Sequence, residues 1–285
     1  MRNNLKTLMF LALLSGALMA FGYLFGGSQG MVAGFAAALM TNFISYWFSD
    51  RIVLSMHNAQ EVQAGDARGL YEMVERLAHR AHIPTPRVYL IPDHSPNAFA
   101  TGRNPHHAAI AVTQGLLSVL NYQELEAVLA HELSHVKHRD TLISCIAATM
   151  AATVLLFANI ARWASIFGGI QRRAENDRGA GALELLVMSI VAPVAAALIQ
   201  FAVSRAREYE ADSRGASLCG NPEWLANALR KIENISAGLP LTSGGPATAH
   251  LYIVNPFSSS ALLNLFSTHP PIEERIARLL EIRPE

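Results

Sequence analysis

Four long apolar runs constrain this chain more strongly than any other feature of its sequence. They cover residues 5–25, 31–48, 141–163 and 183–203. A helix of about 20 apolar residues is long enough to cross the hydrocarbon core of a bilayer. The composition agrees, because 51% of the residues are hydrophobic and only 15% are charged, whereas soluble domains have roughly 25% charged residues. We therefore expect a membrane protein with about four transmembrane helices.

The first two runs are separated only by a short glycine-rich turn at residues 26–30. Two spans joined so tightly predict a helical hairpin, which makes residues 1–50 an N-terminal anchor. Arg2 and Lys6 favour a cytoplasmic N-terminus. Glycines spaced four apart would let the two helices approach closely; these pairs are Gly22 with Gly26 and Gly30 with Gly34. A signal peptide is the competing interpretation of the first run, but its length and the second run favour the anchor.

The later runs, 141–163 and 183–203, predict a second hydrophobic hairpin over residues 141–203. The loop between them is rich in arginine, which argues for the cytoplasmic side, whereas two complete spans would place this loop outside. A re-entrant hairpin that does not cross the membrane is therefore an open alternative. Either arrangement returns the chain to the same side, so the polar segments 51–140 and 204–285 can form one domain.

Segment 51–140 has the composition of a soluble domain. Apolar residues at helical spacing predict an amphipathic helix over residues 69–81. Three short β-like stretches follow, at 88–91, 97–101 and 108–113, and predict a small sheet. Stretch 97–101 could bind an extended peptide through its main chain or could only support a neighbouring helix, and the sequence favours neither.

Charge and cysteine content exclude two other classes of partner or scaffold. The formal net charge is zero and no basic run occurs, so nucleic acid is not an expected partner. Cys145 and Cys219 are the only cysteines. Neither a disulfide framework nor a cysteine-based metal site is therefore expected.

The polar segment before the third apolar run contains the motif His-Glu-Leu-Ser-His at residues 131–135, within a helical pattern. Four residues advance a helix by about 400°, so His131 and His135 project to the same side roughly 6 Å apart. This spacing suits two nitrogen ligands of one zinc ion. Glu132, beside them, can take a proton from a water activated by the metal. The motif predicts zinc-assisted hydrolysis of an amide bond.

The start of this helix is marked by a second pattern. Asn121 is followed three residues later by Glu124, which is the arrangement of a capping box. We therefore expect the helix that carries the motif to begin directly after Asn121.

A catalytic zinc takes a third protein ligand, and residues 204–212 offer acidic side chains on a helical pattern. Glu208 and Asp212 are four residues apart and share one face, whereas Glu210 points away. We expect Glu208 to be the third ligand and Asp212 to hold a ligating histidine through a hydrogen bond. The alternative is a solvated helix start in which nearby arginines pair with these acids.

The C-terminal part predicts two further helices and one candidate catalytic group. Asn221 and Pro222 predict the start of a helix that ends near Ile235, and an apolar stripe over residues 271–282 predicts another. His269 precedes this last helix. It could stabilise the oxyanion of a tetrahedral intermediate, or it could be a structural residue at a helix boundary.

Four motifs in this order resemble those of the HtpX-type membrane zinc metalloproteases, which are gluzincin-like relatives of the CAAX prenyl protease. The motifs are Pro96–Gly102, His131–Asp140, Ser204–Asp212 and Thr268–Arg275. The resemblance implies an α+β membrane protein whose mainly helical, zincin-like protease domain contains a small sheet. It implies one Zn²⁺ ion per chain, with a set of site residues that comprises His131, His135 and Glu208 as ligands, Glu132 as general base and Asp212 supporting a ligand.

The resemblance also implies that Asn97 lies on a substrate-facing strand and that His269 lies close to the site. Family members are multi-pass proteins of the bacterial inner membrane whose protease domain faces the cytoplasm. They degrade misfolded membrane proteins as part of protein quality control and the stress response. The expected partners are therefore unfolded or misfolded membrane proteins and the lipid bilayer.

Three other functions are compatible with parts of this pattern. A prenyl-protein processing protease would have the same zinc site and differ only in its substrate. A site-2-type intramembrane protease would embed the motif in an apolar run, whereas polar residues follow His135 here. A non-catalytic adaptor that only retains zinc would not need Glu132.

Overall fold

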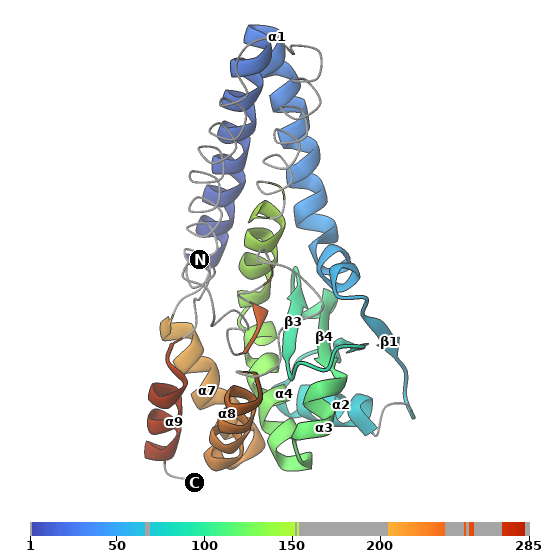
Figure 1. Ribbon diagram of the computed structural model, residues 1–285, viewed down its shortest axis with the longest axis vertical. Coiled ribbons are helices and arrows are strands. Elements are labelled where there is room, and N and C mark those ends of the chain that lie inside the picture. The colour runs from blue at the N-terminus through green and yellow to red at the C-terminus, as the bar shows by residue number, and fades with distance from the viewer. Residues whose placement is uncertain are drawn as a thin grey trace, which may run out of the picture.

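The structure, a computed structural model, consists of a long helical hairpin and a mostly helical body with a small mixed sheet. It describes residues 2–65, 69–151, 153, 205–236, 248, 251–253 and 270–282. Figure 1 shows the two arms of the hairpin projecting together from the body. The expectations for residues 154–203, and for His269, lie outside the described residues.

The hairpin is formed by α1 (Arg2–Met56), whose helical conformation is interrupted at Gly26 and Gly27. Gly27 has φ 58°, a left-handed conformation that glycine adopts readily. The two arms pack closely where a Cβ atom at Gly22 would overlap the carbonyl group of Gly30, and one at Gly34 would overlap Leu18. Of the glycines predicted at the interface, Gly22, Gly30 and Gly34 lie in it, whereas Gly26 lies in the turn.

One helix in the described part of the chain, Gly26–Met56, is long and apolar enough to cross a membrane by its length and composition. Leu11–Ala20 and Asp140–Ala151 form shorter apolar helices. The prediction of about four transmembrane helices is therefore not confirmed.

The sheet contains four strands in the order β1-β2-β4-β3. The strands are β1 (Gln60–Val62), β2 (Arg87–Ile91), β3 (Ala98–Gly102) and β4 (Ala108–Thr113). β2 and β4 are parallel, and the outer pairs are antiparallel. The three predicted strands are present within one residue of their expected bounds. β1 was not predicted, because a three-residue strand with one buried side chain is too short to show an alternating pattern.

Helix α4 (Tyr122–Lys137) lies at the centre of the body, and most of its residues are buried. Asn121 and Glu124 form the predicted capping box, in which each side chain contacts the other residue's backbone N–H at 2.9 Å. The other helices are α2 (Leu70–Ala81), η2 (Pro105–His107), α3 (Gln114–Val119), α7 (Arg205–Cys219), α8 (Pro222–Ser236) and α9 (Ile272–Glu281). The apolar faces of α2, α3, α7, α8 and α9, together with residues of the sheet, pack around α4 in a single core.

The chain turns directly after α4, because Arg139 has φ 58°. The helix Asp140–Ala151 then runs toward the hairpin (Figure 1). Its Ile143 and Ile146 pack with Leu14 and Leu18 of α1 in a separate apolar cluster. This helix therefore connects the body to the hairpin, and the turn places Asp140 at the edge of the site carried by α4.

Candidate metal centre

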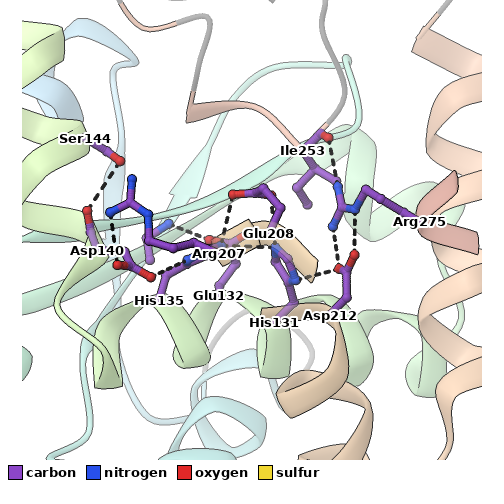
Figure 2. Close-up of polar contacts among 11 residues, drawn as sticks. His131, Glu132, His135, Asp140, Ser144, Arg207, Glu208, Asp212, Ile253 and Arg275 are labelled. Carbon is purple, nitrogen blue, oxygen red and sulfur yellow. Dashed lines mark hydrogen bonds and ion pairs between the residues drawn. The ribbon is translucent and has the colours of Figure 1, made fainter. Parts of the chain in front are cut away.

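The two motif histidines lie on one face of α4 and converge on a single point (Figure 2). His131 Nε2 and His135 Nε2 are 3.2 Å apart. Two nitrogen ligands of a tetrahedral zinc ion, at the usual bond length, are separated by about 3.3 Å. His131 is buried and His135 is mostly buried. The helix alone therefore brings two nitrogen atoms into the arrangement that a metal ion requires.

Glu208, in the first turn of α7, completes this group. Its carboxylate oxygens lie 3.9 Å from His131 Nε2 and 3.6 Å from His135 Nε2. The three ligand atoms lie within 4.8 Å of one another. The structure therefore brings together the three residues that were predicted as ligands, although the segments that carry them are about seventy residues apart in the sequence.

A glycine sets how closely α7 approaches α4. A Cβ atom at Gly215 would lie 2.9 Å from both the Cα and the N of His131, which is too close for any larger residue without a shift of one helix. Gly215 lies three residues after Asp212, so this contact determines the position of both acids of α7 relative to α4. No periodic pattern predicts this role, because an isolated glycine in a helix has several explanations.

Glu132 lies beside the histidines and is buried. Its Oε2 accepts a hydrogen bond of 2.9 Å from the backbone N–H of Ala100 on β3. Burial raises the pKa of Glu132, and Glu208 adds to this, whereas His131 and His135 oppose it. The carboxylate is therefore held in one orientation, with a proton affinity above that of a solvated glutamate, which suits a general base.

Asp212 supports His131, as predicted. Its Oδ1 lies 2.9 Å from His131 Nδ1, and Arg275 of α9 contacts both of its oxygens, at 2.8 and 2.6 Å. Burial by itself would raise the pKa of Asp212, but Arg275 and His131 lower it to about 2. The ionised carboxylate accepts from Nδ1, which leaves Nε2 of His131 available to a metal.

His135 has a corresponding support that the sequence did not reveal. Its Nδ1 lies 3.3 Å from Asp140 Oδ2, and Arg207 donates to the other oxygen of Asp140 at 3.1 Å (Figure 2). Burial would lower the pKa of His135, but Asp140, Glu208 and Glu132 raise it to about 9. Two of the arginines near the predicted ligands contact other acids: Arg207 contacts Asp140 and Arg214 contacts Glu210.

Asn97 lies immediately before β3 and is buried. Its main chain pairs with Thr113, and its Oδ1 accepts from the backbone N–H of Ile253 at 3.1 Å. In this conformation the Asn97 side chain therefore holds a segment of its own chain. Its predicted contact with substrate stays a prediction, as does the role of His269.

The cleft at the histidines is small in this conformation. Phe99 and Ala100 of β3 line one side, Leu251 and Ile253 line another, and the cavity volume is about 50 Å³. A cavity of this size has room for a few water molecules.

The donor set fits zinc: two imidazole nitrogens and one carboxylate, each histidine held by a further carboxylate, are typical of zinc sites with an open position for water. Together with the buried Glu132, this site and the mostly helical fold around a small sheet define a metallopeptidase. The comparisons identify its family. The model of peptidase family M48 matches residues 64–283, and the chain therefore belongs to peptidase family M48, among the proteases of the HtpX type.

Several relatives match over nearly their whole length and are described as "Protease HtpX homolog". Those from Desulforapulum autotrophicum and Desulfatibacillum aliphaticivorans are 51% and 52% identical, over 98% and 100% of this chain and 90% and 91% of the relative. The relative from Pyrococcus furiosus is 52% identical over 98% of this chain and 96% of its own.

Among solved structures, the crystal structure of S. mikatae Ste24p is similar to this fold, with a TM-score of 0.52 and 18% sequence identity. The match covers 98% of this chain and 65% of that chain. At this identity the likeness concerns the fold, so the present chain shares the architecture of about two thirds of Ste24p.

Proposed function

We propose that this chain is a membrane-anchored zinc endopeptidase that hydrolyses peptide bonds in misfolded or damaged membrane proteins. The observation that carries the proposal is the position of Glu132. It lies on the same helix as His131 and His135, and its carboxylate bonds to β3, an edge strand of the sheet in the described part of the chain. A general base is thus held between a metal-binding group and a strand to which a peptide could add.

Zinc bound by His131, His135 and Glu208 would supply a Lewis acid that lowers the pKa of a water molecule toward about 7. Glu132 takes a proton from the attacking water as the water oxygen bonds to the carbonyl carbon of the substrate, and its raised pKa favours this transfer. The N–H of Ala100 holds the carboxylate during this transfer. Glu132 then passes the proton to the amine that leaves from the cleaved bond.

The edge of β3 supports recognition of the substrate main chain. In an antiparallel pair, the backbone groups of every second residue bond to the partner strand, and those of the residues between point away from it. On β3, the N–H of Ala100 points away from β4 and bonds to Glu132. An extended peptide beside this edge would bond through its own main chain, with little dependence on sequence. Such binding suits unfolded segments of many different proteins.

The hairpin supports placement of the site at a bilayer. Gly26–Met56 meets the length and composition of a membrane span, and large apolar side chains such as Leu39, Met40 and Phe43 are exposed on it. We propose that the hairpin lies in the inner membrane of a bacterium and that the protease domain faces the cytoplasm, where misfolded membrane proteins would be presented to it.

The catalytic proposal is tested with the purified full-length chain in detergent, supplied with zinc and with casein as an unfolded substrate. We expect Glu132→Ala to abolish cleavage. The matched control is Glu210→Ala, because Glu210 is an exposed acid of α7 and should leave cleavage unchanged. If Glu132→Ala cleaves casein as well as the parent chain, the mechanism is wrong.

The metal proposal is tested by measuring bound zinc directly. We expect Glu208→Ala to lose stoichiometric zinc together with activity, whereas Glu210→Ala retains both. Zinc retained at one ion per chain in Glu208→Ala would remove Glu208 from the ligand set.

The topology is tested by labelling Arg173→Cys with a reagent that does not cross membranes, with Glu273→Cys as the reporter for the protease domain. Labelling of both from the same side supports a re-entrant hairpin for residues 141–203. Labelling from opposite sides supports two complete spans.

A further inference from the structure

A groove of about 380 Å³ lies where the second arm of α1 meets the sheet, and it shares no lining residue with the cleft at the histidines. One wall is aromatic and comes from α1, with Trp47 and Phe48. The other wall is basic: Arg51 follows on α1, Arg87 belongs to β2, and Arg103 follows β3 directly. None of these residues is part of the proposed catalytic machinery.

The charges of the groove are unbalanced. Arg87 is neutralised by Asp50, at 2.7 Å. Arg51 and Arg103 have no carboxylate within salt-bridge distance in the part of the chain that the structure describes. Instead, the guanidinium of Arg51 lies 5.6 Å from the ring of Phe48, and that of Arg103 lies 4.6 Å from the ring of Trp47. Two positive charges are thus held in place by aromatic rings, and the groove is complementary to an anion.

A second observation distinguishes an amphiphile from a free anion. Exposed apolar side chains at intervals of four residues form a ridge along α1 that ends in the groove; they are Phe35, Leu39, Phe43 and Trp47, with 46, 56, 58 and 44% of their surface exposed. Residues four apart lie on the same side of a helix. The ridge therefore offers an apolar track that leads directly to the two arginines.

We propose that this groove binds one anionic phospholipid, with its phosphate against Arg51 and Arg103 and an acyl chain along the ridge of α1. Arginine suits a phosphate group because its planar fork can donate two parallel hydrogen bonds. Aromatic rings beside basic residues are typical of the level at which a helix leaves the hydrocarbon core. The inference rests on the proposed function in one respect, the placement of α1 in a bilayer.

The lipid would also position the protease domain. Arg103 is joined directly to the last residue of β3, the strand whose Ala100 holds Glu132. Figure 1 shows β3 and β4 beside the end of α1 that enters the body. A lipid held by Arg51 and Arg103 would link α1 to this strand, so β3 would lie at a constant height above the membrane surface.

The test measures lipid retained by the purified full-length chain in detergent, by native mass spectrometry with a chelator present, so that catalysis plays no part. The probes are dioleoyl phosphatidylglycerol and dioleoyl phosphatidylcholine. We expect the parent chain to prefer the anionic lipid by about 30-fold, because each arginine near an anionic headgroup contributes about fivefold. Arg51→Gln/Arg103→Gln should lose this preference, and Arg103→Gln alone should lose about fivefold.

Arg76→Gln is the matched control, since Arg76 also lies over an aromatic ring, at 5.9 Å from that of Tyr122, but outside the groove. It should keep the preference. Equal retention of the two lipids by the parent chain, no retention of either, or an unchanged preference in both Arg103 variants would overturn the proposal. Displacement of the lipid by inorganic phosphate alone would also overturn it, because it would show a simple anion site. If the parent chain prefers the anionic lipid but does not cleave casein, only the proposed function is contradicted.

Discussion

The two histidines of the metal centre are supported by the same residue types in different surroundings. On the His131 side, Arg275 contacts both oxygens of Asp212, and the two side chains are 0% and 5% exposed. On the His135 side, Arg207 Nη1 contacts Asp140 at 3.1 Å, and the side chains are 17% and 13% exposed. The first support is buried, and the second is partly exposed.

The difference shows that two pairs of the same residue types, Asp with Arg, can contribute unequally to the free energy of unfolding. A buried pair has little water to replace a lost partner, so removing one member leaves an uncompensated charge in the core. A pair at the edge of the core can be solvated when it is broken. We therefore expect substitutions on the His131 side to lower the stability of the body. Substitutions on the His135 side should mainly change the affinity for the metal.

The largest expected effect compares Arg275→Met with Arg207→Met. Arg275→Met leaves Asp212 buried without its cation and should lower the free energy of unfolding by about 3–5 kcal/mol, whereas Arg207→Met should lower it by about 1 kcal/mol. Denaturant unfolding of the metal-free protein, followed by circular dichroism, measures both values. Similar losses for the two variants would remove the proposed difference between the sides.

The next comparison concerns metal affinity. Loss of a residue that holds a ligating histidine weakens metal binding by about 10–100-fold. We expect Asp212→Asn to lie near the upper end of this range and Asp140→Asn near the lower end, because Asp212→Asn also disturbs Arg275. Competition with a chelator of known zinc affinity measures this, with Glu210→Gln as an unchanged control. A weaker effect at Asp212 than at Asp140 would reverse the comparison.

Acid titration of the metal-free protein sharpens the comparison further. The pKa of Asp212 is lowered from 3.8 to about 2 in the folded state. Its contribution to stability is therefore complete above pH 4 and is lost as the pH falls toward 2, which amounts to about 2 kcal/mol. Arg207→Met should retain this dependence and Arg275→Met should lack it. Parallel acid-unfolding curves for the parent chain and Arg275→Met would contradict the assignment.

The smallest effect is expected for an exposed ion pair, which serves as the reference for the two buried or partly buried pairs. Arg214 and Glu210 form a pair four residues apart on α7, with 42% and 53% of their side chains exposed. Arg214→Ala should change the free energy of unfolding by no more than about 0.5 kcal/mol. A change as large as that of Arg207→Met would place the Asp140–Arg207 pair among ordinary surface pairs.

Local patterns predicted much of this protein. The hairpin, its glycine turn and the capping box of α4 follow from residues that are neighbours in the sequence or in a helix, so each leaves a periodic or positional signal. The grouping of His131, His135 and Glu208 was also predictable, because the two histidines share one helix and a tetrahedral metal requires a further ligand. The roles of zinc and of the individual site residues, Asn97 and His269 among them, stay predictions.

The supports of the two histidines were only partly predictable. Asp212 shares a helical face with Glu208, which is visible in the sequence. Asp140 comes close to His135 only because Arg139 adopts a left-handed turn, and Arg275 reaches Asp212 only because α9 packs beside α7. The role of Gly215 depends on the close packing of α7 against the backbone of His131.

The sequence by itself therefore determined which groups of this protein can perform chemistry, since their spacing along a helix is dictated by the 3.6-residue turn. The tertiary structure alone decided which charges are buried, which arginine belongs to which aspartate, and how closely α7 approaches α4. The physical reason is that burial and charge pairing depend on distances between segments far apart in the chain, and these distances are set by the packing of the whole core.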